Sequence, residues 1–301
     1  MLPKPLRTGD KVAILSPASI IRPEYVEGAA ETLREAGLRP VVMPHALGRS
    51  GSFSGTAAER LSDFRSALAD PEVRAILCSR GGYGCVHLLE ALAADGAIAG
   101  DPRWLVGFSD VSALHALWGG FGIASVHASM AKQLSKGVAD PFNAEFLGLL
   151  SDPLAFRGTA WAPHPYNRPG TAEAVAAGGN LAVVSELTET PFNVIRPGEI
   201  LVVEDIAEPI YKVERILYRL KLSGVLQNLA GLVVGQFTDY RPSADYAAME
   251  DMVRDMTAPY AYPVAFNAPF GHVDGNRPLL LNQRSRLTVG ASGASLVPVF
   301  N

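Results

Sequence analysis

The sequence predicts an α/β protein in which buried parallel strands alternate with helices. Short apolar runs recur through the first half of the chain, and a segment with helical spacing follows most of them. Strands that are apolar throughout and alternate with helices are typical of a parallel sheet covered on both faces. Apolar residues make up 48% of the chain and charged residues 19%, so we expect a well-folded protein with a substantial core.

The alternation is clearest in the first half of the chain. We expect strands over residues 12–15, 40–43, 73–78, 104–107 and 123–126, and helices over residues 23–36, 56–70, 86–94 and 110–118. The second of these helices begins with the spacing of a capping box, because Glu59 follows Thr56 by three residues. Together these elements predict a first α/β domain over residues 1–150.

The stretch 151–170 interrupts this pattern and is interpreted as a linker between domains. It contains four prolines with interspersed glycines and shows no apolar period. After it we expect strands over residues 172–177, 200–203 and 232–234, helices from residue 180 and over 211–222, and a hairpin formed by residues 286–289 and 294–300. These elements predict a second α/β domain over residues 171–301.

Charge and apolar patterning argue against several classes of partner. The net charge is −4 and no cluster of Lys and Arg occurs, so the sequence gives no basis for binding nucleic acid or an anionic membrane. No apolar run approaches the ~20 residues that span a bilayer. The first ten residues lack the apolar core of a signal peptide, and we therefore expect a cytoplasmic protein.

The sequence favours neither a metal site nor a bound cofactor. Cys78 and Cys85 have a spacing that is typical of neither zinc ligands nor thioredoxin-type redox pairs. In a reducing compartment we expect both to remain thiols. The sequence also contains no His-x-x-x-His or His-Glu-x-x-His motif.

Ser109 lies where an expected strand meets an expected helix, in the sequence Gly-Phe-Ser-Asp. A side chain at this junction projects from the carboxyl edge of the sheet, where open α/β sheets bind ligands. The neighbouring helix N-terminus would stabilise negative charge, as a serine nucleophile requires. The alternative is a simple N-cap, which the local pattern favours because the Gly-x-Ser-x-Gly signature is absent.

Two further segments carry polar groups at the ends of expected strands. Residues 80–84 form the glycine-rich loop Arg-Gly-Gly-Tyr-Gly, whose N–H groups could hold a phosphate or an oxyanion. A plain turn is the alternative, since the loop matches neither a Walker A motif nor Gly-x-Gly-x-x-Gly. Glu204 and Asp205 end the strand at 200–203, so one of these carboxylates points inward or into a cleft, unless both are solvated.

The positions of the six histidines suggest different roles for them. His87 and His115 lie in expected helices, where packing or solvation is the ordinary role. His127 follows the fifth strand and could line the carboxyl edge of the sheet. His272 lies in the irregular segment 269–275, and such loops often carry catalytic groups. The remaining two are His45, after a strand, and His164, in the linker.

Five segments together resemble the LD-carboxypeptidases, also called muramoyltetrapeptide carboxypeptidases, a group that includes the microcin C self-immunity peptidases. They are residues 79–84 (SRGGYG), 107–115 (GFSDVSALH), 178–181 (GGNL), 201–205 (LVVED) and 270–272 (FGH). They occur in the family's order and span almost the whole chain. After the histidine, the resemblance leads us to expect a stretch like Thr-Leu-Pro-Leu-Gly, where Pro-Leu-Leu-Leu-Asn stands at 278–282.

The resemblance implies a catalytic triad formed by Ser109, Glu204 and His272. It also implies a flavodoxin-like N-terminal parallel-sheet domain that carries the serine and a smaller C-terminal α/β domain that carries the other two residues, with the active site between them. The backbone N–H groups of Gly82 and Asp110 would then be the oxyanion donors.

The implied activity is removal of the terminal D-alanine from a murein tetrapeptide during peptidoglycan recycling, without metal or cofactor. We expect a muropeptide as the small-molecule partner, with Arg80 as a further contact to it, and a homodimer. Two alternatives remain open. One is a microcin-type peptidase that cleaves an aminoacyl-nucleotide amide bond, and the other is an inactive relative that binds a small ligand.

Overall fold

The computed structural model describes residues 1–300 and divides them into two compact units. Unit 1 contains Met1–Phe156 and Arg277–Asn282, and unit 2 contains Arg157–Asn276 and the residues from Gln283 onward. This division differs from the expected boundaries at residues 150 and 171. The largest difference is Arg277–Asn282, which belongs to unit 1 because it contributes a strand to the sheet of that unit.

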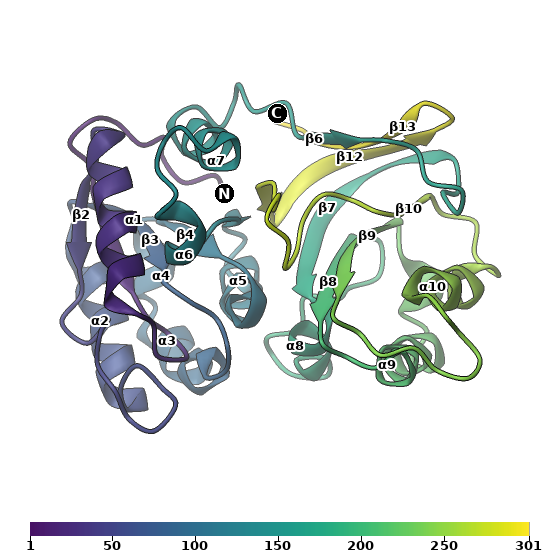
Figure 1. Cartoon of the computed structure of the whole chain (residues 1–301), viewed down its shortest axis with the longest axis horizontal. Coiled ribbons are helices and arrows are strands. Elements are labelled where there is room, and N and C mark those ends of the chain that lie inside the picture. Colours follow the sequence, from purple (N-terminus) through teal and green to yellow (C-terminus); the bar gives the residue numbers. More distant parts are fainter. Residues whose placement is uncertain (301) are drawn as a thin grey trace. The chain divides into compact units, whose positions relative to one another are not determined.

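Unit 1 is a doubly wound α/β unit built on a six-stranded sheet (Figure 1). Its strands are β1 (Lys11–Leu15), β2 (Arg39–Val42), β3 (Val73–Cys78), β4 (Trp104–Gly107), β5 (Ser125–His127) and β11 (Leu279–Leu281). The first five are parallel in the order β2-β1-β3-β4-β5, which is the flavodoxin-like order, and β11 pairs antiparallel with β5. The expected flavodoxin-like fold is confirmed.

Helices cover both faces of this sheet. They are α1 (Pro23–Glu35), α2 (Ala57–Ala69), α3 (Leu89–Asp95), α4 (Ala97–Gly100), α5 (Ser112–Gly120), α6 (Ala131–Leu134) and α7 (Pro141–Ser151), with the short 3₁₀ segments η1 (Cys85–Leu88) and η2 (Ser109–Val111). Helix α1 packs against α6, while α3 packs against both α2 and α5 (Figure 1). The capping box of α2 is present, with reciprocal hydrogen bonds between Thr56 and Glu59.

Two buried tryptophans fix the strand and the helix on either side of Ser109. Trp104 begins β4 and Trp118 lies in α5, and both are fully buried. Each indole N–H donates to a backbone carbonyl, that of Lys4 at 2.8 Å and that of Arg103 at 3.1 Å. Large aromatic side chains contribute much of the stability of a core, and both indole N–H groups have hydrogen-bond partners. The two tryptophans therefore hold β4 and α5 firmly in the core on either side of the β4–α5 connection.

Unit 2 is built on a mixed seven-stranded sheet. Its strands are β6 (Thr159–Trp161), β7 (Gly170–Asn180), β8 (Ile200–Ile206), β9 (Gly231–Thr238), β10 (Val264–Ala265), β12 (Gln283–Gly290) and β13 (Gly293–Pro298). The order is β10-β9-β8-β7-β12-β13-β6, parallel from β10 to β7 and antiparallel from β7 to β6. The expected hairpin is β12–β13, and the expected linker contains the short strand β6.

The helices of unit 2 gather on one face of its sheet (Figure 1). They are α8 (Leu181–Glu186), α9 (Ile210–Leu222) and α10 (Met249–Thr257), with a 3₁₀ segment η3 (Leu226–Asn228), and α9 packs against both α8 and α10. The parallel strands β7 and β8 are each followed by one of these helices, so their carboxyl ends and the starts of α8 and α9 share one edge of the unit. Among residues 1–300, no helix combines the length and apolar character that crossing a membrane requires.

Arg277–Asn282 is anchored in unit 1 at both of its ends. Arg277 forms an ion pair with Glu145 on α7, with 2.9 Å between Nε and Oε2. Asn282 has a φ of 60°, and its side-chain amide donates to the carbonyl of His115 at 2.8 Å and to Ser125 Oγ at 3.2 Å. The resemblance predicts glycine at this position, and asparagine is among the few other residues that adopt the left-handed region readily.

Substitution of Asn282 separates the backbone requirement from the hydrogen bonds. Asn282→Ala loses both side-chain hydrogen bonds and adopts the left-handed region poorly, so the free energy of unfolding should fall by about 2–4 kcal/mol. Asn282→Gly loses the same hydrogen bonds without the steric cost and should be the more stable variant by about 1 kcal/mol. Urea unfolding followed by circular dichroism measures both. Equal stability of the two variants would show that the left-handed backbone imposes no cost here.

Candidate functional site

Ser109 is the first residue of η2, directly after the sharp turn that follows β4, and it is partly exposed. Its φ is 65°, in the left-handed region that serine adopts only when the surrounding structure imposes it. The N-cap positions of η2 and α5 are Phe108 and Val111, so the interpretation of Ser109 as an N-cap is wrong. A serine with strained backbone at a strand-to-helix turn has the geometry of a nucleophile elbow, although the usual sequence signature is absent.

The glycine-rich loop lies directly against this turn. A methyl group on Gly81 would lie 2.9 Å from Ser109 Cβ and 3.1 Å from both Ser109 Oγ and the Asp110 nitrogen, so the approach is possible only because residue 81 has no side chain. The carboxylate of buried Asp110 accepts a hydrogen bond from the N–H of Cys85 at 2.9 Å. This bond ties the end of the loop to the residue that follows Ser109.

The expected oxyanion donors are the backbone N–H groups of Gly82 and Asp110. An oxyanion can be bound only by N–H groups that do not already donate within the protein. Among residues 1–300, neither backbone N–H donates a hydrogen bond to another residue, so both remain available to an anion. Gly82 has a φ of 102°, and a methyl group there would lie 2.2 Å from Ser19 Oγ. Only glycine therefore fits at position 82.

Arg60, which no sequence motif singles out, is a buried cation that holds the far end of the glycine-rich loop. Its guanidinium donates to the carbonyl of Gly84 at 2.9 Å and also to that of Pro17, while its Nε donates to the carbonyl of Gly55 at 3.2 Å. Burial lowers the pKa of Arg60, but arginine remains charged at physiological pH. The available signal was an arginine on the apolar face of α2, one helical turn before the buried Phe64.

Arg80, the expected substrate contact, is exposed on the loop. Its Nη1 donates to the carbonyl of Ile20 at 2.6 Å, which fixes one side of the guanidinium. Arg80 directly precedes Gly81, the residue that approaches Ser109, and part of its donor set is already used by Ile20.

His115 supports the turn from inside the core. It is buried on α5, and its ring contacts the carbonyl of Gly107 through Nε2 and Ser125 Oγ through Nδ1, both at 2.9 Å. Burial lowers the pKa of His115 to about 4, against a smaller opposite effect of the bond to Gly107, so the ring is neutral near pH 7. This is the packing role expected from its position in a helix.

Glu204 and His272 form a hydrogen-bonded pair in unit 2, with 2.7 Å between Glu204 Oε2 and His272 Nδ1. The carboxylate side chain is 0% exposed and the imidazole 17%, so the acid lies inside the unit and the ring reaches its surface. Gly271 has a φ of 123°, and a methyl group there would lie 3.1 Å from Glu204 Oε2. A glycine before the histidine is what allows this segment to pass so close to β8.

The charges around His272 favour its protonated form. Burial lowers the pKa of the ring, but the hydrogen bond that the ring donates to Glu204 and the negative charges of Glu204, Asp205 and Asp239 outweigh burial and raise the pKa above its ordinary value. Because Nδ1 contacts the carboxylate, Nε2 is the nitrogen that can exchange a proton with a reacting group.

Asp205 is buried as well, but its carboxylate contacts the start of α8 instead of His272. Its carboxylate accepts hydrogen bonds from Asn180 Nδ2 and from the N–H of Ala182, both at 2.9 Å. Burial raises the pKa of Asp205 to about 6, although these bonds act in the opposite direction. Both members of the acidic pair are thus inside the unit, where Glu204 binds the histidine and Asp205 fixes the start of α8.

A second histidine–carboxylate pair, in unit 1, was not predicted. His45 Nδ1 lies 2.8 Å from Oδ1 of buried Asp63, which joins the loop after β2 to α2. No motif links these two residues, so only the fold reveals the pair. Because His45 also contacts a carboxylate, it is the natural control for His272.

His127 is buried at the end of β5, with its ring centre 5.5 Å from that of Phe108.

The cysteines are poorly suited to act as nucleophiles. Cys78 and Cys85 are buried, and burial together with the nearby charge of Asp110 raises the pKa of both thiols well above the usual range. In the part of the chain that the structure describes, no three His, Cys, Asp or Glu side chains gather where they could hold a metal ion. The candidate catalytic groups are therefore Ser109, with the N–H donors beside it, and the pair of His272 and Glu204. A serine, N–H donors and a histidine–carboxylate pair are the components of acyl-transfer chemistry.

Two known domain families match this chain in sequence. Residues 12–128 match the LD-carboxypeptidase N-terminal domain, and residues 173–287 match the LD-carboxypeptidase C-terminal domain. The murein tetrapeptide carboxypeptidase of Pseudomonas aeruginosa is 31% identical over 274 residues, which cover 89% of each chain.

Solved structures resemble the chain over nearly its full length. The crystal structure of muramoyltetrapeptide carboxypeptidase from Oxalobacter formigenes is 26% identical, with a TM-score of 0.84 that covers 96% of this chain and 99% of the other. The microcin C7 self-immunity protein MccF in its wild-type apo state has a TM-score of 0.86 at 20% identity, covering 100% of this chain and 99% of the other. The second likeness shows the fold alone.

The pKa of His272 tests the electrostatics of unit 2. In the wild-type protein, an NMR titration of the ring should give a pKa above the ordinary ~6.5. Glu204→Gln removes the charge and keeps the shape, so this pKa should fall. His115 is the internal control, because its ring should stay neutral down to about pH 4 in both proteins. An unchanged His272 pKa in the variant would contradict the pairing of these two residues.

Proposed function

Because the chain belongs to the LD-carboxypeptidase family, as its motifs predicted, we propose that it is a serine-type peptidase that releases terminal D-alanine from murein tetrapeptides in peptidoglycan recycling. The observation that carries the proposal is Ser109, held in a left-handed turn between a buried strand and a helix. Such a turn exposes a hydroxyl beside unused N–H donors, as a nucleophile requires. The relatives from Pseudomonas aeruginosa and Oxalobacter formigenes support murein tetrapeptides as the substrate class.

In the proposed reaction, His272 Nε2 accepts the proton of Ser109 as Oγ attacks the carbonyl carbon of the scissile bond. Glu204 orients the imidazole through Nδ1 and stabilises its charged form. The N–H groups of Gly82 and Asp110 donate to the oxyanion. The C–N bond breaks as His272 gives its proton to the nitrogen of the leaving D-alanine. Water, deprotonated by the same ring, then hydrolyses the acyl-enzyme and frees Ser109.

The proposed triad takes its serine from unit 1 and its histidine and carboxylate from unit 2. Neither unit alone therefore carries this catalytic set. The pair of His45 and Asp63 lies in the same unit as Ser109 and is the alternative base that experiments must separate from His272.

Because a general base acts in its neutral form, the raised pKa of His272 places the acid limit of activity above about pH 6.5.

The stereochemistry of the substrate tests the proposal. A site shaped for a terminal D residue misplaces the scissile carbonyl of an L-ended isomer, and a small misplacement can lower the rate by about 100-fold. The protein should release D-alanine from L-Ala–D-Glu–X–D-Ala, where X is L-lysine or diaminopimelate, and leave the L-Ala-ended isomer almost untouched. The pentapeptide that ends in D-Ala–D-Ala should also be poor, since its last bond joins two D centres. Mass spectrometry of the products measures each rate.

Three variants complete this experiment. Ser109→Ala should lose about 1,000-fold or more in rate with a nearly unchanged melting temperature, and His272→Ala should be similarly inactive. His45→Ala should remain active. Equal rates on the D-ended and L-ended peptides would contradict the proposal, as would a Ser109→Ala protein that keeps a tenth of the activity. Activity confined to aminoacyl-nucleotide amides would instead indicate the microcin-type alternative, and binding without turnover would indicate an inactive relative.

A further inference from the structure

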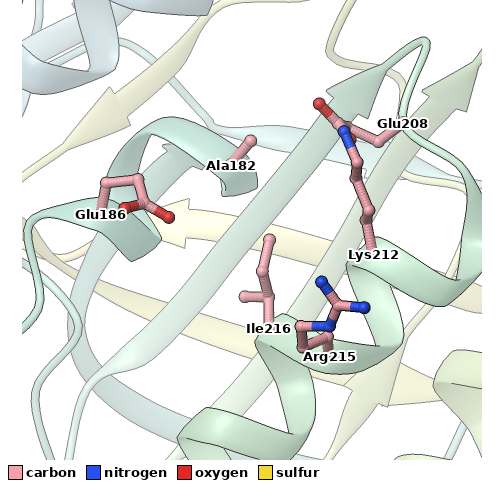
Figure 2. Close-up of a pocket in the computed structure, with 6 residues that line it drawn as sticks. All are labelled: Ala182, Glu186, Glu208, Lys212, Arg215 and Ile216. Atoms are coloured by element: carbon pink, nitrogen blue, oxygen red, sulfur yellow. The ribbon is translucent and has the colours of Figure 1, made fainter.

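Arg60 is a buried cation whose charge is not matched by a carboxylate. The residue is 2% exposed, and among residues 1–300 its guanidinium forms no ion pair with an Asp or Glu side chain. The cations that line the cavity beside α8 and α9 of unit 2 are different, since Lys212 is 51% exposed and lies 3.5 Å from Glu208 Oε2 (Figure 2). A buried charge is costly unless hydrogen bonds compensate for it, so the hydrogen bonds of Arg60 indicate its role.

The guanidinium of Arg60 joins separate segments of unit 1. Nε donates to the carbonyl of Gly55 at 3.2 Å, and Nη1 donates both to the carbonyl of Gly84 at 2.9 Å and to that of Pro17. Nη2 lies 3.2 Å from His87 Nδ1. The planar group with five N–H donors makes this arrangement possible. A single nitrogen, Nη1, thus connects the glycine-rich loop to the loop after β1.

The bond to Gly84 fixes a peptide group that also binds Asp110. The carbonyl of Gly84 and the N–H of Cys85 belong to one planar peptide group. Its oxygen accepts from Arg60, and its N–H donates to the carboxylate of Asp110 at 2.9 Å. A methyl group on Gly81 would lie 3.1 Å from the Asp110 nitrogen, so the loop passes close to that N–H. Arg60 therefore holds the loop against the residue that supplies one proposed oxyanion donor.

The bond to Pro17 bears on the other proposed oxyanion donor. Ser19 follows Pro17 by two residues, and its N–H donates to the carbonyl of Gly81 at 3.2 Å. That carbonyl shares a peptide group with the N–H of Gly82, and in a trans peptide group the C=O and N–H bonds point in opposite directions. The N–H of Gly82 is therefore directed away from Ser19. Through Pro17, Arg60 anchors the segment that sets this direction.

We propose that Arg60 is a positioning residue that sets the directions of the two oxyanion donors, the backbone N–H groups of Gly82 and Asp110. The inference rests on the proposed function, because it concerns the same oxyanion. Arg60 acts through the backbone of the two loops and not by contact with the substrate. Donors of this kind stabilise the transition state only when they point at the developing negative charge. Their misdirection therefore lowers the rate and leaves substrate binding nearly unchanged.

Arg60→Lys tests the inference, because it keeps the charge but replaces the planar fork with one rotatable ammonium. The rate constant for labelling of Ser109 by a fluorophosphonate should fall about 100-fold, since the P=O oxygen of this probe takes the position of the oxyanion. The kcat on the tetrapeptide should fall by a similar factor. The Kd of the tetrapeptide, measured in a Ser109→Ala background, should stay within about threefold. Partial unfolding would lower the labelled fraction instead of the rate constant.

Arg103→Lys is the matched control. Arg103 is also a buried arginine of unit 1 that donates to backbone carbonyls, those of Asp101 at 2.6 Å and Asp70 at 3.4 Å. It precedes β4, whereas Ser109 follows this strand, so the two lie at opposite edges of the sheet. Arg103→Lys should therefore lower the melting temperature and leave the labelling rate constant unchanged.

Asp110→Asn provides a second variant that keeps the shape of the side chain. It weakens the bond from the N–H of Cys85, so labelling of Ser109 should slow about tenfold. Combining it with Arg60→Lys should cost less than the product of the two separate losses, because both side chains bind one peptide group. If Arg60→Lys does not fold, an unchanged labelling rate in Asp110→Asn would overturn the inference.

The outcomes separate this inference from the proposed function. Labelling of Ser109 at the wild-type rate in Arg60→Lys would overturn the positioning role, as would equal losses in Arg60→Lys and Arg103→Lys. Labelling that depends on Arg60, without release of D-alanine from any tetrapeptide, would remove the proposed substrate and leave the positioning role in place. A wild-type protein whose Ser109 is not labelled would remove both.

Discussion

The left-handed backbone of Ser109 is the constraint on which the candidate site of unit 1 depends. A φ of 65° costs a serine about 1–2 kcal/mol, so the neighbouring structure has to hold it. On the strand side, Trp104 anchors β4 in the core and His115 binds the carbonyl of Gly107. On the helix side, the carboxylate of Asp110 binds the end of the glycine-rich loop. These contacts hold the Ser109 hydroxyl at a partly exposed position between a buried strand and a helix.

Close backbone approach is a second requirement, and it occurs in both units. Gly81 lets the glycine-rich loop reach Ser109, and Gly271 lets the segment before His272 reach Glu204. In unit 2 this approach places a charged carboxylate out of contact with solvent. Its Oε1 has no hydrogen-bond partner among residues 1–300, so the contact of Oε2 with His272 carries the stabilisation of its charge. The same contact raises the pKa of the ring and fixes its orientation.

The sequence predicted the long buried strands well, because parallel strands covered on both faces are continuous apolar runs; β3 has the predicted bounds. The short strands β6, β10 and β11 were missed, since two or three residues carry no period and their pairing partners lie far away in the chain. The φ of Ser109 has no sequence signal either. The glycine-rich loop contains several glycines, and the sequence alone could not show that Gly81 is the one that contacts the Ser109 turn. The pairing of His45 with Asp63 could not be predicted either, because it depends on packing between elements that are distant in the sequence.

We propose that Ser109 is a nucleophile that His272 activates. Labelling with a fluorophosphonate, followed by peptide mass spectrometry, measures this activation most directly because only an activated serine reacts rapidly. We expect a single label on the peptide that contains Ser109 in the wild-type protein, and a labelling rate lower by orders of magnitude in folded His272→Ala. A label on another serine, or equal labelling of Ser109 with and without His272, would contradict it.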